Sequence, residues 1–303
     1  MPTARRVVPV VLAGVLLLAA CGAEEGGAGS DGGPVASGTL CPTGTPLPLP
    51  SSGDPAESDV KVTGLYGCGA EFSADFEVTN DGTEAATYTV TLGFLDGSGG
   101  VLDNREQIVE SVGAGKTAKG TVAMGESPSA DVAGVTVVKV RSVPDDEASS
   151  ASGPCPASGM HVYADQGDAA LGLRAVGLHL VNCGSRPVEI NGYPEVELHD
   201  EDHETVDGVR ILQGTAEIST GLGDDTPRPL VLRPGEVARA SLAWRNTTGA
   251  GEPVNAPYVR VWAKPGADPV MVIPELDLGT TGKLGVGAWT KDETYRGTET
   301  PAS

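Results

Sequence analysis

Short segments in which apolar and polar residues alternate make up most of the chain between residues 54 and 290. Residues 72–78 and 88–94 are the clearest examples, because every second residue in each is apolar. A period of two is typical of a strand that buries one face. A turn signal follows each segment, Asn80-Asp81-Gly82 after the first and Asp96-Gly97 after the second. The pattern therefore predicts β-strands joined by tight turns.

The first group of strands predicts a domain over residues 54–143. Short strands with a turn about every ten residues indicate an antiparallel β-sandwich. The element order also resembles extracytoplasmic immunoglobulin-like domains, whose pattern is matched by Phe72, Val78, Asn80, Asp96 and Gly99. That resemblance implies an immunoglobulin-like sandwich. The expected strands are Val60–Tyr66, Phe72–Val78, Thr87–Phe94, Val101–Val112, Thr117–Met124 and Val132–Val140.

A second sandwich is expected over residues 155–290, after an acidic linker at residues 144–154 and before a polar tail at residues 291–303. The linker is small and polar, and such composition is typical of a domain boundary. The fold class is thus all-β, with two immunoglobulin-like antiparallel sandwiches. The strands expected in the second are Met160–Ala164, Leu171–Asn182, Val188–Ile190, Val196–His199, Val206–Leu212, Pro229–Leu232, Ala238–Trp244, Tyr258–Ala263 and Val270–Ile273.

The N-terminus carries an export signal over residues 1–20. Arg5 and Arg6 precede an apolar run, and the segment ends in Leu18-Ala19-Ala20-Cys21. The apolar stretch is shorter than the roughly 20 residues of a spanning helix. The signal resembles that of bacterial lipoproteins, which implies a diacylated Cys21 at the new N-terminus and a protein anchored to the outer face of the cytoplasmic membrane.

Two alternatives stay open for this signal: a plain secretory signal with an incidental Cys21, and export by the twin-arginine route through Arg5-Arg6. The following residues, 21–53, are rich in Gly, Ser and Pro, and we expect a flexible tether there.

Composition narrows the class of protein. The 43 glycines and 23 prolines argue against a helical bundle, because both residues destabilise helix interiors. The net charge is −21, and removing Arg5 and Arg6 leaves 18 basic against 41 acidic residues, a charge of −23. Such a charge argues against nucleic acid or bare anionic membrane as a partner. No cofactor is predicted.

With Cys21 assigned to lipid, four cysteines remain for an oxidising compartment. Pairing within each half of the chain predicts the disulfides Cys41–Cys68 and Cys155–Cys183. Each would close a loop of about 28 residues, worth about 3–4 kcal/mol. Metal binding is the alternative, but the chain has no C-x-x-C pair. Both pairs open as Cys-Pro and close as Cys-Gly, which a duplicated module or coincidence would explain.

Five short motifs make the second sandwich similar to actinobacterial lipoproteins that carry the domain of unknown function 4232. The family implies a secreted β-sandwich and supplies no activity. The motifs are Asn182-Cys183, Gly192-Tyr193-Pro194, Leu198-His199-Asp200, Leu232-Arg233-Pro234-Gly235 and Leu242-Ala243-Trp244.

Candidate metal ligands cluster at His199, Asp200, Asp202 and His203, since imidazole and carboxylate both bind divalent cations. Residues four apart in a strand lie about 13 Å apart, so the two histidines could share an ion only if the segment turns. The alternative is a charged hairpin tip. His161 and His179 suggest a copper carrier, but alternation places His179 on the face opposite Leu178 and Leu180.

Three tryptophans could stack on sugar rings. Trp244 shares parity with Leu242, which predicts a core position, and the face of Trp262 is ambiguous. Trp289 lies in the Gly-rich segment 285–289, so we expect it to be exposed and take it as a candidate ligand contact.

No catalytic pattern is complete. Ser58-Asp59-Val60-Lys61 matches S-x-x-K but enters a strand and lacks its partner motifs. The leading hypothesis is therefore a non-catalytic module that binds an envelope protein or glycan. An envelope enzyme with a loop-built active site, and a protein that binds through calcium or another metal, are the alternatives.

Overall fold

The computed structural model describes residues 45–46, 59–68, 71–125, 132–222 and 226–293. These residues all belong to one compact unit, Pro42–Ser303. The predicted signal peptide, Cys21, Cys41, most of the tether and most of the tail lie outside the described residues, as does the side chain of Cys68. In the part of the chain that is described, no helix is long and apolar enough to cross a membrane.

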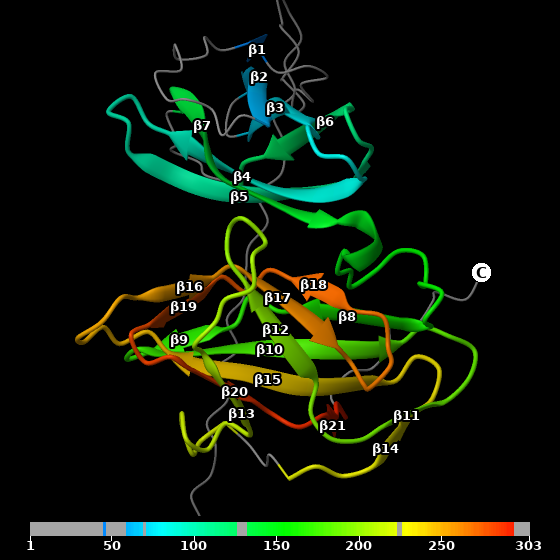
Figure 1. Cartoon of the computed structure of the whole chain (residues 1–303). Coiled ribbons are helices and arrows are strands. Elements are labelled where there is room, and N and C mark those ends of the chain that lie inside the picture. The colour runs from blue at the N-terminus through cyan, green and yellow to red at the C-terminus, as the bar shows by residue number, and fades with distance from the viewer. Residues whose placement is uncertain (1–44, 47–58, 69–70, 126–131, 223–225, 294–303) are drawn as a thin grey trace, which may run out of the picture. The chain divides into compact units, whose positions relative to one another are not determined.

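The first sandwich consists of two antiparallel sheets, so the predicted all-β class is confirmed (Figure 1). One sheet has the strand order β1-β2-β3-β6 and the other β5-β4-β7. Alternation was a reliable guide for β2 to β7, which each lie within a few residues of their predicted positions, whereas β1 lies in the segment expected to be a tether. The bounds are β1 Thr45–Pro46, β2 Val60–Cys68, β3 Glu71–Thr79, β4 Ala86–Leu95, β5 Val101–Val112, β6 Thr117–Ala123 and β7 Gly134–Pro144.

The second sandwich is built on a larger sheet with the order β13-β20-β15-β10-β8, to which β9 and β21 add. A second sheet, β12-β17-β18, packs against it, and β11-β14 and β16-β19 form short ribbons. The bounds are β8 Met160–Ala164, β9 Asp168–Ala170, β10 Leu173–Asn182, β11 Val188–Ile190, β12 Glu195–His199, β13 Arg210–Gln213, β14 Leu230–Leu232, β15 Val237–Arg245, β16 Val254–Ala256, β17 Tyr258–Trp262, β18 Val270–Val272, β19 Leu276–Gly279, β20 Lys283–Val286 and β21 Thr290–Lys291.

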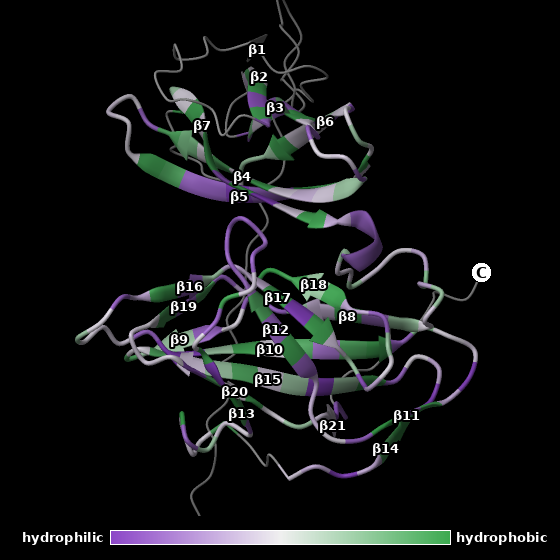
Figure 2. Cartoon of the chain, viewed as in Figure 1, coloured by the Kyte–Doolittle hydropathy of each residue, from purple (hydrophilic) through white to green (hydrophobic). Residues whose placement is uncertain are grey.

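Each sandwich has its own cluster of buried hydrophobic residues. Strand β10 is mainly hydrophobic in Figure 2, and its Leu178 and Leu180 are fully buried. His179 lies between them on the other face, as its parity predicts. The strand expected at Val206–Leu212 begins only at Arg210, because Gly208 adopts a left-handed turn there. The short strands β11, β14 and β18 lie at their predicted positions, whereas β9, β16, β19, β20 and β21 were not predicted.

A buried asparagine closes the end of each sandwich. Asn80 is 2% exposed, and its amide nitrogen donates to the carbonyls of Glu84 and Val112 at 2.8 and 2.7 Å. Its side-chain oxygen accepts the Gly82 N–H at 2.9 Å. Its backbone pairs with the next turn, donating to Lys116 and accepting from Gly115.

Asn182 repeats every one of these bonds in the second sandwich. It is 0% exposed, and its amide nitrogen donates to the carbonyls of Arg186 and Leu232, both at 2.8 Å. Its side-chain oxygen accepts the Gly184 N–H, and its backbone bonds Glu236 and Gly235. The partner turns each require a left-handed glycine, Gly115 and Gly235, which only glycine adopts readily.

Strand order agrees with this repetition. The order β2-β3-β6 in the first sandwich corresponds to β8-β10-β15 in the second, with Asn80 ending β3 and Asn182 ending β10. The pairing of β4 with β7 corresponds to that of β12 with β17. The two sandwiches therefore share one structural plan.

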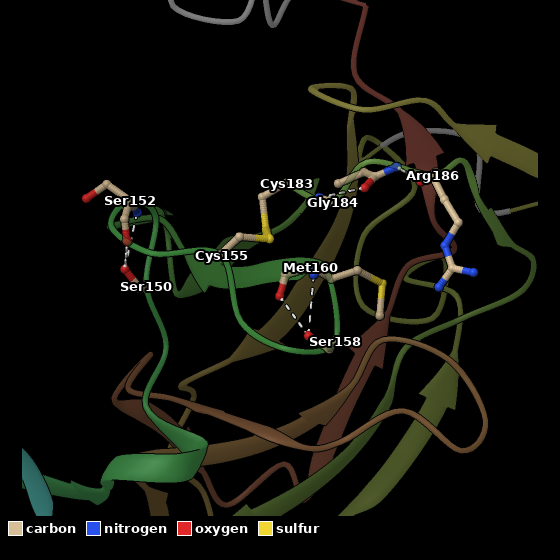
Figure 3. Close-up of a disulfide and its surroundings, with 9 residues drawn as sticks. Ser150, Ser152, Cys155, Ser158, Met160, Cys183, Gly184 and Arg186 are labelled. Atoms are coloured by element: carbon tan, nitrogen blue, oxygen red, sulfur yellow. Dashed lines mark hydrogen bonds between the residues drawn. A yellow bond between two sulfur atoms is a disulfide. The ribbon is translucent and has the colours of Figure 1, made fainter.

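The predicted disulfide Cys155–Cys183 is present (Figure 3). It joins the segment that follows the first sandwich to the end of β10, across a sequence separation of 28 residues. Nearby, the Ser158 hydroxyl bonds both the N–H and the carbonyl of Met160, at 3.4 and 3.3 Å. The loop before β8 is thereby fixed at two points.

We predict that Asn182→Ala lowers the free energy of unfolding by about 3 kcal/mol, because two buried carbonyls and one N–H lose their partner. Denaturant unfolding of the full chain measures this. Asn255→Ala is the matched control, since Asn255 is exposed and makes no side-chain hydrogen bond among the described residues. Equal stabilities for the two variants would contradict the structural role of Asn182.

Candidate binding cleft along strand β8

A cleft of about 1160 Å³ runs along strand β8. Its walls are the outward face of β4, β5 and β7, the segment 145–158, and residues 268–275 beside β18. Thr87, Thr89 and Thr91 form a row of hydroxyls on β4, and Ile108 lies opposite Thr89 on β5. The cleft therefore offers both polar and apolar surface to a ligand.

Strand β8 presents an unpaired edge to this cleft. Among the described residues it pairs with β10 alone. Asp165, just beyond the strand, donates its N–H to Gly177 of β10, so the backbone groups of odd-numbered residues point toward β10. Those of Met160, Val162 and Ala164 point the other way. The Ser158 hydroxyl bonds the backbone N–H and carbonyl of Met160. The backbone groups of Val162 and Ala164 therefore remain at the open edge.

His161 is the most unusual side chain in the cleft wall. It is 6% exposed, and it makes no hydrogen bond or ion pair with any residue that the structure describes. No buried side-chain nitrogen or oxygen among the described residues lacks a partner, so the ring nitrogens of His161 reach the surface of the cleft, where they can bond a ligand.

Carboxylates dominate the charge of the cleft. Eight Asp or Glu and two Lys or Arg line it. Both cations, Lys139 and Arg141, are bound to Glu275, Arg141 through two bonds of 2.9 and 3.2 Å. Five of the carboxylates have no ion pair within the described part of the chain: Glu106, Glu110, Asp145, Asp146 and Asp268. The cleft is suited to a cationic ligand.

Ion pairs and a small apolar cluster hold the walls in place. Glu147 of the helix η1, Asp145–Glu147, bonds Arg260 at 2.8 Å. Ala148 forms a parallel bridge to Met271 of β18, and Val143 packs with Tyr258 and Met271. The segment expected as a linker thus contacts β17 and β18 directly, and the hydrophilic η1 is conspicuous in Figure 2.

Arg141 is the central cation of this contact. It is only 11% exposed on its side chain and bonds Glu275 and Glu201. Burial lowers the pKa of Arg141, but the hydrogen bond and charge of Glu275 outweigh burial and raise it overall. Burial also raises the pKa of Tyr258, whose hydroxyl accepts the Ser142 N–H at 3.2 Å.

Two residues at this contact hold strained backbone. Glu275 and His203 have φ of 53° and 61°, a region that L-residues other than Asn and Asp seldom adopt. The Glu275 side chain bonds Arg141, and the His203 ring stacks on Tyr258 with centroids 4.3 Å apart. Strain of about 1–3 kcal/mol is retained where the side chain is needed.

The candidate metal ligands His199, Asp200, Asp202 and His203 do not assemble as a site. The segment does turn, but His199 Nδ1 bonds the His203 carbonyl at 2.9 Å and Nε2 bonds Glu197 at 2.8 Å. One Asp200 oxygen accepts the N–H groups of Asp202 and Glu204, which closes the hairpin tip. No group of three metal-ligand side chains occurs among the described residues.

The expectation that Trp289 is exposed is wrong. Trp289 is 1% exposed, and its ring N–H donates to the Ala263 carbonyl at 2.9 Å. Its ring lies in the hydrophobic core, so Trp289 cannot stack on a sugar. Trp244 is buried as predicted, and its ring N–H donates to Asp277.

A second groove, of about 670 Å³, lies on the outward face of β10 and β15. Asp165 bonds His179 Nε2 at 3.2 Å there, and the His179 ring stacks on Tyr163. Burial raises the pKa of Asp165, but the N–H groups of Gly177 and Gly167 and the His179 ring outweigh it and hold that pKa below its usual range. These bonds fix a turn, which gives the pair a structural role.

Sequence reasoning missed the cleft. His161 drew attention only as a copper ligand, and neither Arg141 nor Glu275 stood out. Burial without a partner and strain in the backbone are properties of the fold and leave no local pattern in the chain.

The fold and cleft define an all-β protein of two sandwiches with a ligand-sized groove. Residues 155–290 match the model of a family described as a domain of unknown function, DUF4232. The match covers the second sandwich and confirms its resemblance to that domain of unknown function.

The other comparisons add little. No curated protein matches the chain. The crystal structure of red sea bream transglutaminase aligns with 76% of this chain and 31% of its own, at 11% identity and a TM-score of 0.19. The chain therefore spans less than a third of that protein, and so low a score supports no inference.

We predict that acid destabilises the protein partly through His203. Burial lowers its pKa from 6.5, so the unfolded state binds the proton more tightly. The free energy of unfolding should fall as pH drops from about 6.5 through the lowered pKa. In His203→Asn, which tolerates the left-handed backbone, this fall should be smaller.

Denaturant unfolding at pH 7.5 and at pH 5 measures the effect, and the values at pH 7.5 separate it from any loss that does not depend on pH. An identical difference between the two pH values in both proteins would contradict it.

Proposed function

We propose that the protein is a lipid-anchored, extracytoplasmic binding protein that presents the β8 cleft to a partner in the cell envelope. The partner is a protein or a glycan of the envelope, and no catalytic step is required of the chain. Membrane attachment is through lipid on Cys21, on the outer face of the cytoplasmic membrane.

The sequence supports the location. Arg5-Arg6, the apolar run and Leu18-Ala19-Ala20-Cys21 have the order of a lipoprotein signal. Two or more acyl chains suffice for stable anchoring. The actinobacterial origin of similar lipoproteins and the immunoglobulin-like class of the first sandwich belong to the same proposal.

The cleft supports the binding role, and His161 is the observation that carries it. Its imidazole nitrogens reach the surface of the cleft beside an unpaired strand edge, and a ligand can form hydrogen bonds with both. Ligand sites also occur preferentially where two domains meet.

Acylation is tested by mass spectrometry of the mature chain from a bacterial host. We expect a chain that begins at Cys21 and carries at least two acyl groups, and Cys21→Ser should move the protein out of the membrane fraction. Ser30→Ala, in the tether, is the matched control. A mature chain that begins elsewhere, or an unmodified Cys21, would contradict the anchor.

Binding is tested by site-specific photo-cross-linking on intact cells. A photoreactive residue at Ser152, in the cleft, should capture a discrete partner. The same residue at Val231, which is exposed on β14 away from the cleft, should not. Equal capture at both positions, or hydrolysis of a cell-wall or ester substrate that one cleft substitution abolishes, would contradict a binding role.

A further inference from the structure

The two sandwiches differ at one equivalent edge. In the first, the outer edge of β2 is covered by β1, which pairs with it antiparallel through Thr45–Gly67 and Pro46–Tyr66. In the second, the equivalent strand β8 has no strand on its outer edge among the described residues. The fold thus accepts an added strand at this position, and in the second sandwich the position opens into the cleft.

The open edge has hydrogen-bonding groups to offer. The backbone groups of Val162 and Ala164 point into the cleft, and both side chains contribute to the core. In an antiparallel pair, directly opposed residues share a face, and every second opposed pair exchanges its backbone bonds. A strand added to β8 would therefore bond Val162 and Ala164 through its own core-facing residues.

The surroundings specify the side chains of such a strand. On the side of the core, the cleft is lined by Val270, Val272 and Ile273, which suit apolar side chains. On the outward side lie the carboxylates without ion pairs, among them Glu106 and Glu110, which suit basic side chains. His161 faces outward on β8, where a neutral imidazole nitrogen can accept a hydrogen bond from a lysine ammonium.

From these observations we propose that β8 binds an extended basic peptide segment of a partner protein as an added antiparallel strand. Apolar residues of the segment face the core and basic residues face the carboxylates. Strand addition supplies affinity through the backbone and specificity through alternate side chains. This inference rests on the proposed binding function and names the ligand chemistry for it.

The test uses the purified full chain and a fluorescent octapeptide of alternating lysine and valine, blocked at both ends. We expect saturable binding by fluorescence anisotropy that weakens as salt is added. N-methylation of the valine amides removes the bonds to β8 and should weaken binding about tenfold or more, whereas N-methylation of the lysine amides should leave it within about twofold.

Variants of the protein test the charge. Glu106→Gln with Glu110→Gln should weaken binding about fivefold at low salt. The matched control, Glu204→Gln with Glu252→Gln, removes the same charge from exposed residues outside the cleft and should change little. His161→Phe retains the ring and removes the acceptor, and should also weaken binding.

Equal loss from both N-methylated peptides, or equal loss from both pairs of glutamine variants, would overturn strand addition at β8. So would the absence of peptide binding, or binding of a soluble chitooligosaccharide in place of the peptide. If cross-linking at Ser152 still captures a partner in those cases, the proposed binding function stands and only the peptide assignment fails.

Discussion

The buried asparagines are the constraint on which both sandwiches depend. Asn80 and Asn182 each tie together the end of one strand, the turn that follows it and a strand from outside its own sheet. An amide side chain is required because its NH2 group donates to two carbonyls while its oxygen accepts a hydrogen bond from a backbone N–H. The rest of each core is held by burial of the apolar face of each strand, which also specifies the register of the sheets.

Alternation in the sequence predicted the strands of the first sandwich and the longer strands of the second, because each buries one face. The Asn80-Asp81-Gly82 turn was also predictable, as was the buried position of Trp244. Trp289 was not, because glycine-rich sequence is as compatible with close packing of a ring as with an exposed loop. The cleft was beyond prediction, since it depends on residues such as His161 and Glu275 that distant segments bring together.

At the contact around Arg141, two residues adopt backbone conformations that their residue types disfavour, and their side chains form contacts there. His203 and Glu275 would be easier to accommodate as glycine, yet glycine would lose the ring stack on Tyr258 and the ion pair with Arg141. The chain retains strained backbone at two points of a single contact. This contact also sets the position of one cleft wall relative to β8, so the strain and the cleft have the same structural origin.

The disulfide between Cys155 and Cys183 has a mechanical consequence. A pull that reaches residue 154 from the N-terminal side passes through the sulfur bridge to the end of β10, which has a neighbouring strand on both sides in the large sheet. Strand β8 lies inside the loop that the disulfide closes. The force therefore bypasses β8 through the disulfide and does not pull β8 away from β10 one residue at a time. An edge strand that would otherwise be the first to detach is thereby shielded from load, and its exposed backbone keeps its shape while the chain is under strain.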